Sequence, residues 1–140
     1  MNFIKGKEDS VIMYLIIRKS LNMSPGKLAA QCSHATQMLM FKYMEFKIQS
    51  MNASNNCLPP FSREKYNLFQ EWFDGAFTKV VLKADEKQWK KLKEEFSERD
   101  RVLVVDAGLT ELEPKTETCI GFLPIKKSDC PKLISRLRLL

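Results

Sequence analysis

The sequence is poor in the residues that build metal and redox sites. Among its 140 residues there is one histidine, and no two of the four cysteines stand two or three positions apart. Structural zinc sites combine several Cys and His ligands at short spacings, so no metal site is expected. The cysteines, at positions 32, 57, 119 and 130, are interpreted as free thiols, which suits a reducing compartment.

Long hydrophobic runs are missing as well. The longest apolar stretch, Val11–Ile17, is much shorter than the roughly 20 residues that a membrane helix needs. Residues 1–10 contain several charged side chains and lack the apolar core of a signal peptide. We therefore expect no membrane segment and a cytoplasmic location.

The composition is that of a folded domain with a basic surface. Apolar residues make up 44% of the chain and charged residues 29%, and 23 basic against 17 acidic residues give a net charge of +6. A chain of this length suits one domain. The charge is compatible with a nucleic-acid partner, although many small proteins are mildly basic without one.

Apolar periodicity and capping residues predict four strands and four helices. Ser24 suits an N-cap and Pro25 the first helical position, so a helix is expected to begin there. The expected strands are Val11–Ile17, Thr78–Lys83, Val102–Val105 and Thr118–Phe122, and the expected helices run from Pro25 to about Ile48, from Phe61 to about Phe73, over Glu86–Glu98 and from about Ser128. This order predicts a single α/β domain over residues 11–140, with a mixed four-stranded sheet flanked by helices on both faces. Residues 1–10 would form an N-terminal extension.

The start of the first predicted helix carries an unusual set of polar residues. Lys27 in the first turn opposes the helix dipole, which makes sense where an anion binds, although a solvated lysine is the alternative. Gln31 and His34 follow at helical spacing, so the three side chains share one face. That face is typical of a polar cleft wall. The histidine is a candidate general base, and a structural or substrate-contacting role is equally open.

A second polar group follows the third predicted strand, in the segment DAGLT at residues 106–110. Asp106 stands at the carboxyl end of that strand, where open α/β sheets bind their ligands, although an Asp in a turn that binds its own backbone is as common. Thr110 and Thr118 add hydroxyls near the same edge. No G-x-S-x-G elbow, P-loop or dinucleotide motif occurs. The simplest chemistry is a water positioned by a carboxylate or lysine.

Taken together, these segments resemble a known enzyme family. The run GKLAAQCSHA, Gly26–Ala35, and the run DAGLTELEPKTETCIGFLP, Asp106–Pro124, are similar to signature segments of the type 2 peptidyl-tRNA hydrolases. TKVVLKA, Thr78–Ala84, and the final RLRLL extend the likeness across residues 11–140. The resemblance implies a mixed four-stranded sheet, often in a dimer, and an enzyme that releases tRNA from peptidyl-tRNA without a cofactor.

The resemblance also implies roles for particular residues. Lys27, Asp106 and Thr110 match the positions regarded as catalytic in that family. The residues expected to contact substrate are Gly26, Gln31, His34, Gly108 and Thr118. The partner would be peptidyl-tRNA, with a homodimer possible. The alternative is a catalytically silent RNA-binding or protein-interaction descendant of the same fold.

The chain departs from the family pattern at three positions. Pro25 stands where a lysine is common, Leu109 where an arginine is common, and Glu111 where a glutamine is common. Two positive charges are lost and one negative charge is gained beside the expected phosphate-binding edge. These changes bear on tRNA affinity rather than on the expected catalytic residues.

Overall fold

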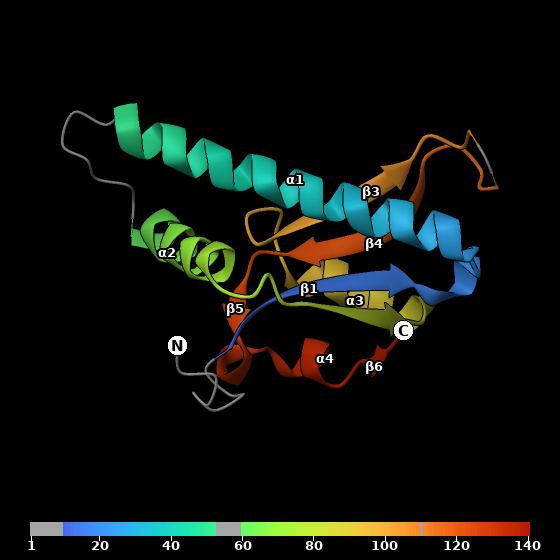
Figure 1. The fold of residues 1–140 in the computed structure, drawn as a ribbon. Coiled ribbons are helices and arrows are strands. Elements are labelled where there is room, and N and C mark those ends of the chain that lie inside the picture. Colours follow the sequence, from blue (N-terminus) through green and yellow to red (C-terminus); the bar gives the residue numbers. More distant parts are fainter. Residues whose placement is uncertain (1–9, 53–59, 110) are drawn as a thin grey trace.

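The computed structural model describes residues 10–52, 60–109 and 111–140. In this part of the chain a mixed sheet lies between two layers of helices (Figure 1). The elements are β1 (Val11–Arg18), η2 (Lys19–Leu21), α1 (Pro25–Asn52), α2 (Pro60–Asp74), β2 (Lys79–Ala84), α3 (Glu86–Glu95), β3 (Arg101–Asp106), β4 (Thr116–Phe122), β5 (Ile125–Lys126), η3 (Lys127–Asp129), α4 (Lys132–Ser135) and β6 (Arg138–Leu139).

The sheet is built around β1, whose residues 11–17 are all buried. The strand order is β3-β4-β1-β2-β6, and β5 also pairs with β1. β1 is parallel to β2 and antiparallel to β4, and β3 is antiparallel to β4. The predicted mixed sheet with helices on both faces is therefore confirmed. Its strand number is corrected from four to six, because β5 and β6 have two residues each, too few to leave a periodic pattern in the sequence.

Alternation along β1 divides the core between the two helical layers. Met13, Leu15 and Ile17 pack with α1 and α2, whereas Tyr14 and Ile16 pack with α3 and α4. Successive side chains of a strand point to opposite faces of the sheet, so an all-apolar strand such as β1 must be covered on both. The helix α1 approaches β4 closely, since a Cβ on Gly121 would lie 2.9 Å from Leu39 Cδ1 and 3.3 Å from Ala35 Cβ.

Several element ends differ from the predicted ones. α1 continues to Asn52, beyond the expected end near Ile48, because no proline or glycine interrupts it. The final helix begins at Lys132 rather than near Ser128, since Pro131 takes the N-cap position and a 3₁₀ turn precedes it. The Asn, Ser and Pro-Pro residues at positions 50–60 are typical of a surface loop. In the structure α1 extends through Asn52 and α2 begins at Pro60, and residues 53–59 lie outside the described residues. None of the helices in the described ranges combines the length and hydropathy of a bilayer span.

Candidate active site

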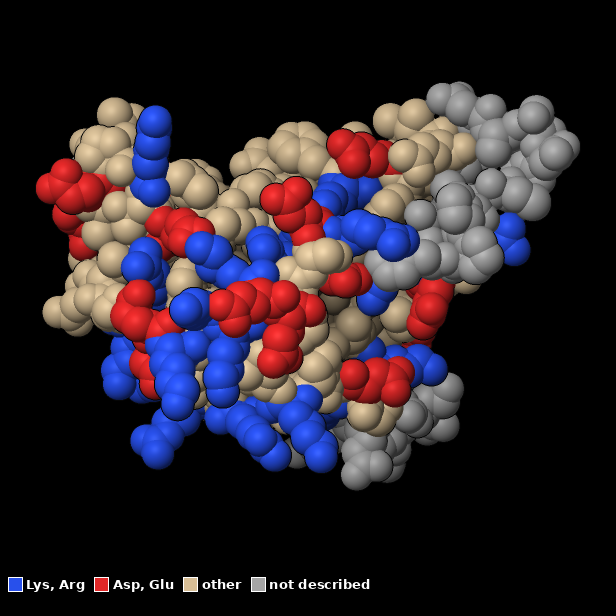
Figure 2. Space-filling model, turned by 180° about the vertical axis from the view of Figure 1, so that it is seen from behind, with Lys and Arg blue, Asp and Glu red and all other residues tan. Residues whose placement is uncertain are grey.

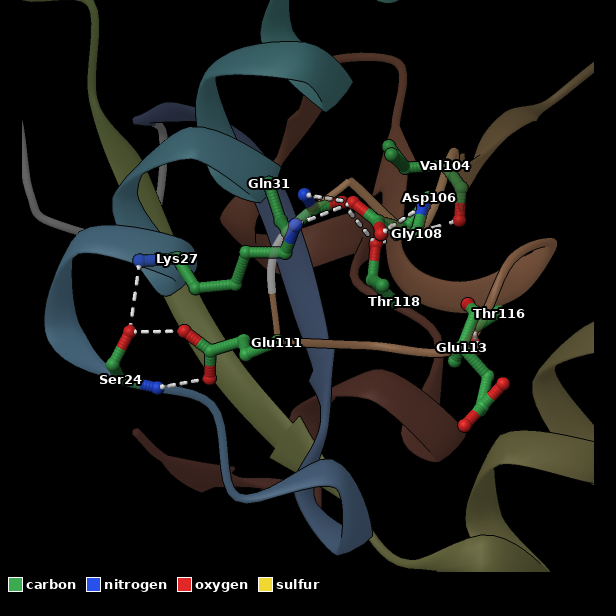
Figure 3. Close-up of polar contacts among 10 residues, drawn as sticks. All are labelled: Ser24, Lys27, Gln31, Val104, Asp106, Gly108, Glu111, Glu113, Thr116 and Thr118. Carbon is green, nitrogen blue, oxygen red and sulfur yellow. Dashed lines mark hydrogen bonds and ion pairs between the residues drawn. The ribbon is translucent and has the colours of Figure 1, made fainter.

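The topology brings the two predicted polar groups to one edge of the sheet. β3 runs parallel to β1, so Asp106 at its carboxyl end lies at the edge where β1 turns toward the start of α1. There, Lys27 Nζ lies 2.6 Å from Asp106 Oδ1 (Figure 3). The side chains are only 10% and 8% exposed. Ion pairs this well buried are sensitive to the loss of either partner.

The carboxylate of Asp106 is held by neutral donors in addition to Lys27. Gln31 Nε2 donates to Oδ1 at 3.1 Å, and the backbone N–H of Gly108 donates to Oδ2 at 2.7 Å. Gly108 has a φ of +76°, and a Cβ there would lie 2.5 Å from the nitrogen of Pro114, so only glycine fits. The hydrogen bond from Lys27, supported by those from Gly108 and Gln31, holds the pKa of Asp106 below its usual range although burial opposes this. Asp106 is therefore a carboxylate at neutral pH.

A β-bulge in β4 provides the support beneath Gln31. Val104 pairs with Cys119, but the next residue of β3, Val105, pairs with Glu117, so Thr118 is an extra residue in the ladder. The bulge turns its hydroxyl toward α1, where it donates to Gln31 Oε1 (Figure 3). Because the amide oxygen is occupied in this way, the amide nitrogen of Gln31 is left to face Asp106.

Thr118→Val is expected to slow, by about tenfold, the reaction that this site catalyses. It should also reduce the free energy of unfolding by about 1–3 kcal/mol. The substitution keeps the shape but leaves the buried Gln31 oxygen without its donor. Freed from this partner, the amide can flip and present its oxygen to Asp106, repelling the carboxylate. Single-turnover kinetics and urea unfolding would measure the two effects. Thr118→Ser, which keeps the hydroxyl, should restore most of the rate, and equal losses in both variants would contradict a positioning role.

The ion pair opens into a cleft of about 830 Å³ between α1 and the β3 edge. Lys27 and Asp106 lie at one end with Val105 beside them, and Met38 and Phe41, further along α1, extend the apolar wall. Gly26 and the exposed His34 also line it, whereas Thr118 has no exposed surface and lies beneath it. The arrangement suits a substrate with a polar reacting bond and an apolar neighbouring group.

Glu111 ties the segment after β3 to the beginning of α1. Its Oε2 accepts from the backbone N–H of Ser24 at 3.1 Å, and its Oε1 accepts from the Ser24 hydroxyl. These bonds from Ser24 lower the pKa of Glu111. A carboxylate near a helix N-terminus is favourable, so Glu111 takes a position that an anionic ligand would otherwise use. This contact could not be inferred from the sequence, because Ser24 and Glu111 are 87 positions apart.

The structure therefore brings together Lys27, Gln31, Asp106 and Gly108, with Thr118 as a support and with Gly26 and His34 on the cleft wall. Thr110, predicted as catalytic, lies outside the described residues. Among those described, no group of three or more His, Cys, Asp or Glu side chains is arranged to bind a metal ion. The three described cysteines are free thiols.

Comparison with known proteins gives consistent matches. The family model for peptidyl-tRNA hydrolase PTH2 matches residues 11–140. A peptidyl-tRNA hydrolase of Methanopyrus kandleri is 32% identical over 129 residues, which are 90% of this chain and 95% of the relative. One from Saccharolobus islandicus is 33% identical over 133 residues, or 93% of this chain and 99% of the relative. One from Thermoplasma acidophilum is 29% identical over 132 residues, or 91% and 97%.

Proposed function

Because this chain belongs to the peptidyl-tRNA hydrolase PTH2 family, we propose that its cleft around Lys27 and Asp106 carries out the hydrolysis of peptidyl-tRNA. The reaction cleaves the ester between the peptide and the terminal ribose and releases free tRNA. The observation that carries the assignment of the site is the buried 2.6 Å ion pair at one end of an open cleft. A residue pair with this burial and such a cleft is a typical active-site arrangement.

Ester hydrolysis needs a positioned water and relief of the negative charge that develops on the carbonyl oxygen. Water adds to the acyl carbon and gives up one proton, the bond to the ribose oxygen breaks, and that oxygen takes up one proton, so that the net reaction transfers a proton from the water to the ribose. Asp106 would orient the water as a hydrogen-bond acceptor. Its lowered pKa makes it a weak proton acceptor, so orientation is its principal role. Lys27 would stabilise the developing oxyanion.

The remaining residues act around this pair. Thr110 would help to place the water, and Gly26 and His34 would contact the substrate along the cleft wall. Gln31 and Thr118 would fix the carboxylate, and the N–H of Gly108 would hold its second oxygen. Residues 11–140 would form the catalytic domain, with residues 1–10 as an N-terminal extension.

The test is the release of N-acetyl-amino acid from N-acetyl-aminoacyl-tRNA, measured as a function of pH against an enzyme-free blank. We expect turnover with no acid limb between about pH 5 and 8, because Asp106 stays ionised until the pH falls through its depressed pKa, below the ordinary aspartate value of about 3.9. A histidine base would give an acid limb between about pH 5 and 8. His34→Ala should keep most of the rate. An acid limb between about pH 5 and 8 that disappears in His34→Ala would contradict the role given to Asp106. It would indicate instead that His34 acts as the base.

We also infer that the protein binds tRNA in the cytoplasm, serves translation and forms a homodimer. The net charge of +6 supports RNA binding, and membership of the peptidyl-tRNA hydrolase family supports a role in translation. Exposed apolar side chains on α1, among them Met44, Ile48 and Met51, support a dimer contact. Light scattering would measure the mass in solution, and a single-chain mass at micromolar concentration would contradict the dimer.

A further inference from the structure

A second concave surface, which we term the basic groove, lies between α3 and α4 on the face of the sheet opposite to α1. It consists of two adjoining hollows of about 290 and 520 Å³ that share Asp85, Gln88 and Arg136. The cationic residues lining it are Lys19, Lys83, Lys87, Lys91, Lys132, Arg136 and Arg138. Only Asp85 and Glu95 oppose these seven cations in the lining. Figure 2 views the molecule from behind and shows Lys and Arg side chains gathered across the lower left.

The charges of the basic groove are not neutralised within the fold. In the described part of the chain none of the seven cations forms an ion pair with a carboxylate. Asp85 accepts the N–H of Gln88 at 2.8 Å as the cap of α3. Nearby cations outside the groove are paired, as in Arg18 with Glu86 and Lys93 with Glu117. Like charges gathered in a concavity favour an anionic ligand.

The catalytic cleft has the opposite character. Its described lining includes one cation, Lys27, together with the carboxylates Asp106 and Glu111. A polyanion cannot be held there by charge, because the lining is net negative and its lysine is engaged with Asp106. Affinity for a nucleic acid comes chiefly from phosphate contacts by Lys and Arg. Those contacts must therefore lie outside the cleft.

The basic groove is within reach of the same substrate. Lys83 lies near the carboxyl end of β2, and Asp106 ends β3 at the same edge of the sheet. β1 and β4 stand between these strands, so three strand spacings separate them, about 14 Å in all. An extended nucleic acid whose 3′ end enters the cleft can continue around this edge to the opposite face.

We propose that the basic groove binds backbone phosphates of the tRNA, away from the ester that is cleaved. The inference rests on the proposed function, since it assigns the groove to the same substrate. The cleft would then select the peptide ester, and the groove would supply the electrostatic affinity. Binding through phosphate contacts in the groove is independent of base sequence.

The double variant Lys132→Gln/Arg136→Gln tests the basic groove. Both side chains are exposed and form no side-chain hydrogen bond among the described residues, so the fold should persist. Deacylated tRNA should bind the variant roughly 5- to 30-fold more weakly at 0.15 M salt, for one or two lost phosphate contacts. The slope of log affinity against log salt should shrink by about one to two. The control Lys47→Gln/Arg63→Gln also removes one lysine and one arginine charge, from exposed positions on α1 and α2. It should change neither the affinity for tRNA nor its salt dependence appreciably.

Two substrates separate this inference from the proposed function. On N-acetyl-aminoacyl-tRNA the groove variant should show a raised KM and an unchanged kcat. On the same amino acid esterified to a CCA trinucleotide, which is too short to reach the groove, it should match the wild type. Equal tRNA affinity in the groove variant and the control, or equal losses on both substrates, would overturn the groove assignment. A wild-type protein that binds tRNA through the groove but hydrolyses neither ester would leave the groove standing and remove the proposed function.

Discussion

Asp106→Asn is expected to lower kcat for N-acetyl-aminoacyl-tRNA by about 10²–10⁴-fold, the range typical of a positioned acid–base group. The amide has nearly the same shape as the carboxylate but carries no charge, and one of its two polar atoms is a donor. Since both carboxylate oxygens accept hydrogen bonds, from Lys27, Gln31 and Gly108, that donor must face another donor. The water would lose its anionic acceptor, and the ammonium of Lys27 would lose its counter-ion.

The same change should reduce the free energy of unfolding by about 3–5 kcal/mol, because it breaks the buried ion pair and leaves the ammonium of Lys27 uncompensated. Asp100→Asn is the matched control, since it neutralises a carboxylate paired with Lys65 at the opposite end of β3. Turnover under single-turnover conditions and thermal unfolding should be measured on both variants. If Asp106→Asn retained more than about a tenth of the wild-type kcat, Asp106 would not be the residue that positions the water.

Lys27→Ala is expected to lower kcat by about 10²–10³-fold, the usual loss when one donor to a developing oxyanion is removed. Breaking a buried ion pair also costs about 3–5 kcal/mol of stability. We expect a loss near the lower end of this range of about 3–5 kcal/mol. Gln31 and Gly108 still donate hydrogen bonds to Asp106 in the variant, and removing a lysine from the first helical turn relieves its unfavourable interaction with the helix dipole. Lys47→Ala, exposed on the same helix, should change stability by less than about 0.5 kcal/mol.

The stability loss in Lys27→Ala should depend on pH. The hydrogen bond from Lys27 is the main cause of the lowered pKa of Asp106. A carboxylate with a depressed pKa stabilises the fold above its ordinary value of about 3.9, and this contribution is lost as the pH falls through the folded-state pKa. The difference between wild type and Lys27→Ala should therefore be largest at neutral pH and shrink below about pH 4. Urea unfolding at pH 7 and pH 3 would measure it, and an equal difference at both values would contradict the ion-pair interpretation.

The main features of the fold follow from local patterns in the sequence. The seven apolar residues of β1 predict a central strand, and Ser24-Pro25 places the start of α1. Lys27 and Asp106 could be paired in advance because each marks an element end at the same edge of the sheet. The two-residue strands β5 and β6 could not be predicted from the sequence. They are too short to show a periodic pattern, and their pairing depends on the assembled sheet.

The supports of the site were less predictable than its principal residues. Thr118 was expected to contact substrate, yet its hydroxyl is directed beneath the cleft by a one-residue bulge. A bulge is a property of strand pairing, so the sequence of β4 alone gives no sign of it. The bond between Ser24 and Glu111 likewise joins segments that meet only when α1 and β3 are assembled.

The bulge at Thr118 makes the pairing of β3 and β4 less regular and at the same time provides the hydroxyl that supports Gln31. An uninterrupted ladder between β3 and β4 would pair the backbone regularly, and the extra residue breaks that regularity just before the end of β3. A chain lacking this residue would pair β3 and β4 more regularly but would have no hydroxyl beneath Gln31. Selection for resistance to heat alone can therefore favour deletion of Thr118, but not a substitution that keeps the bulge and removes the hydroxyl, whereas selection for turnover should retain the threonine.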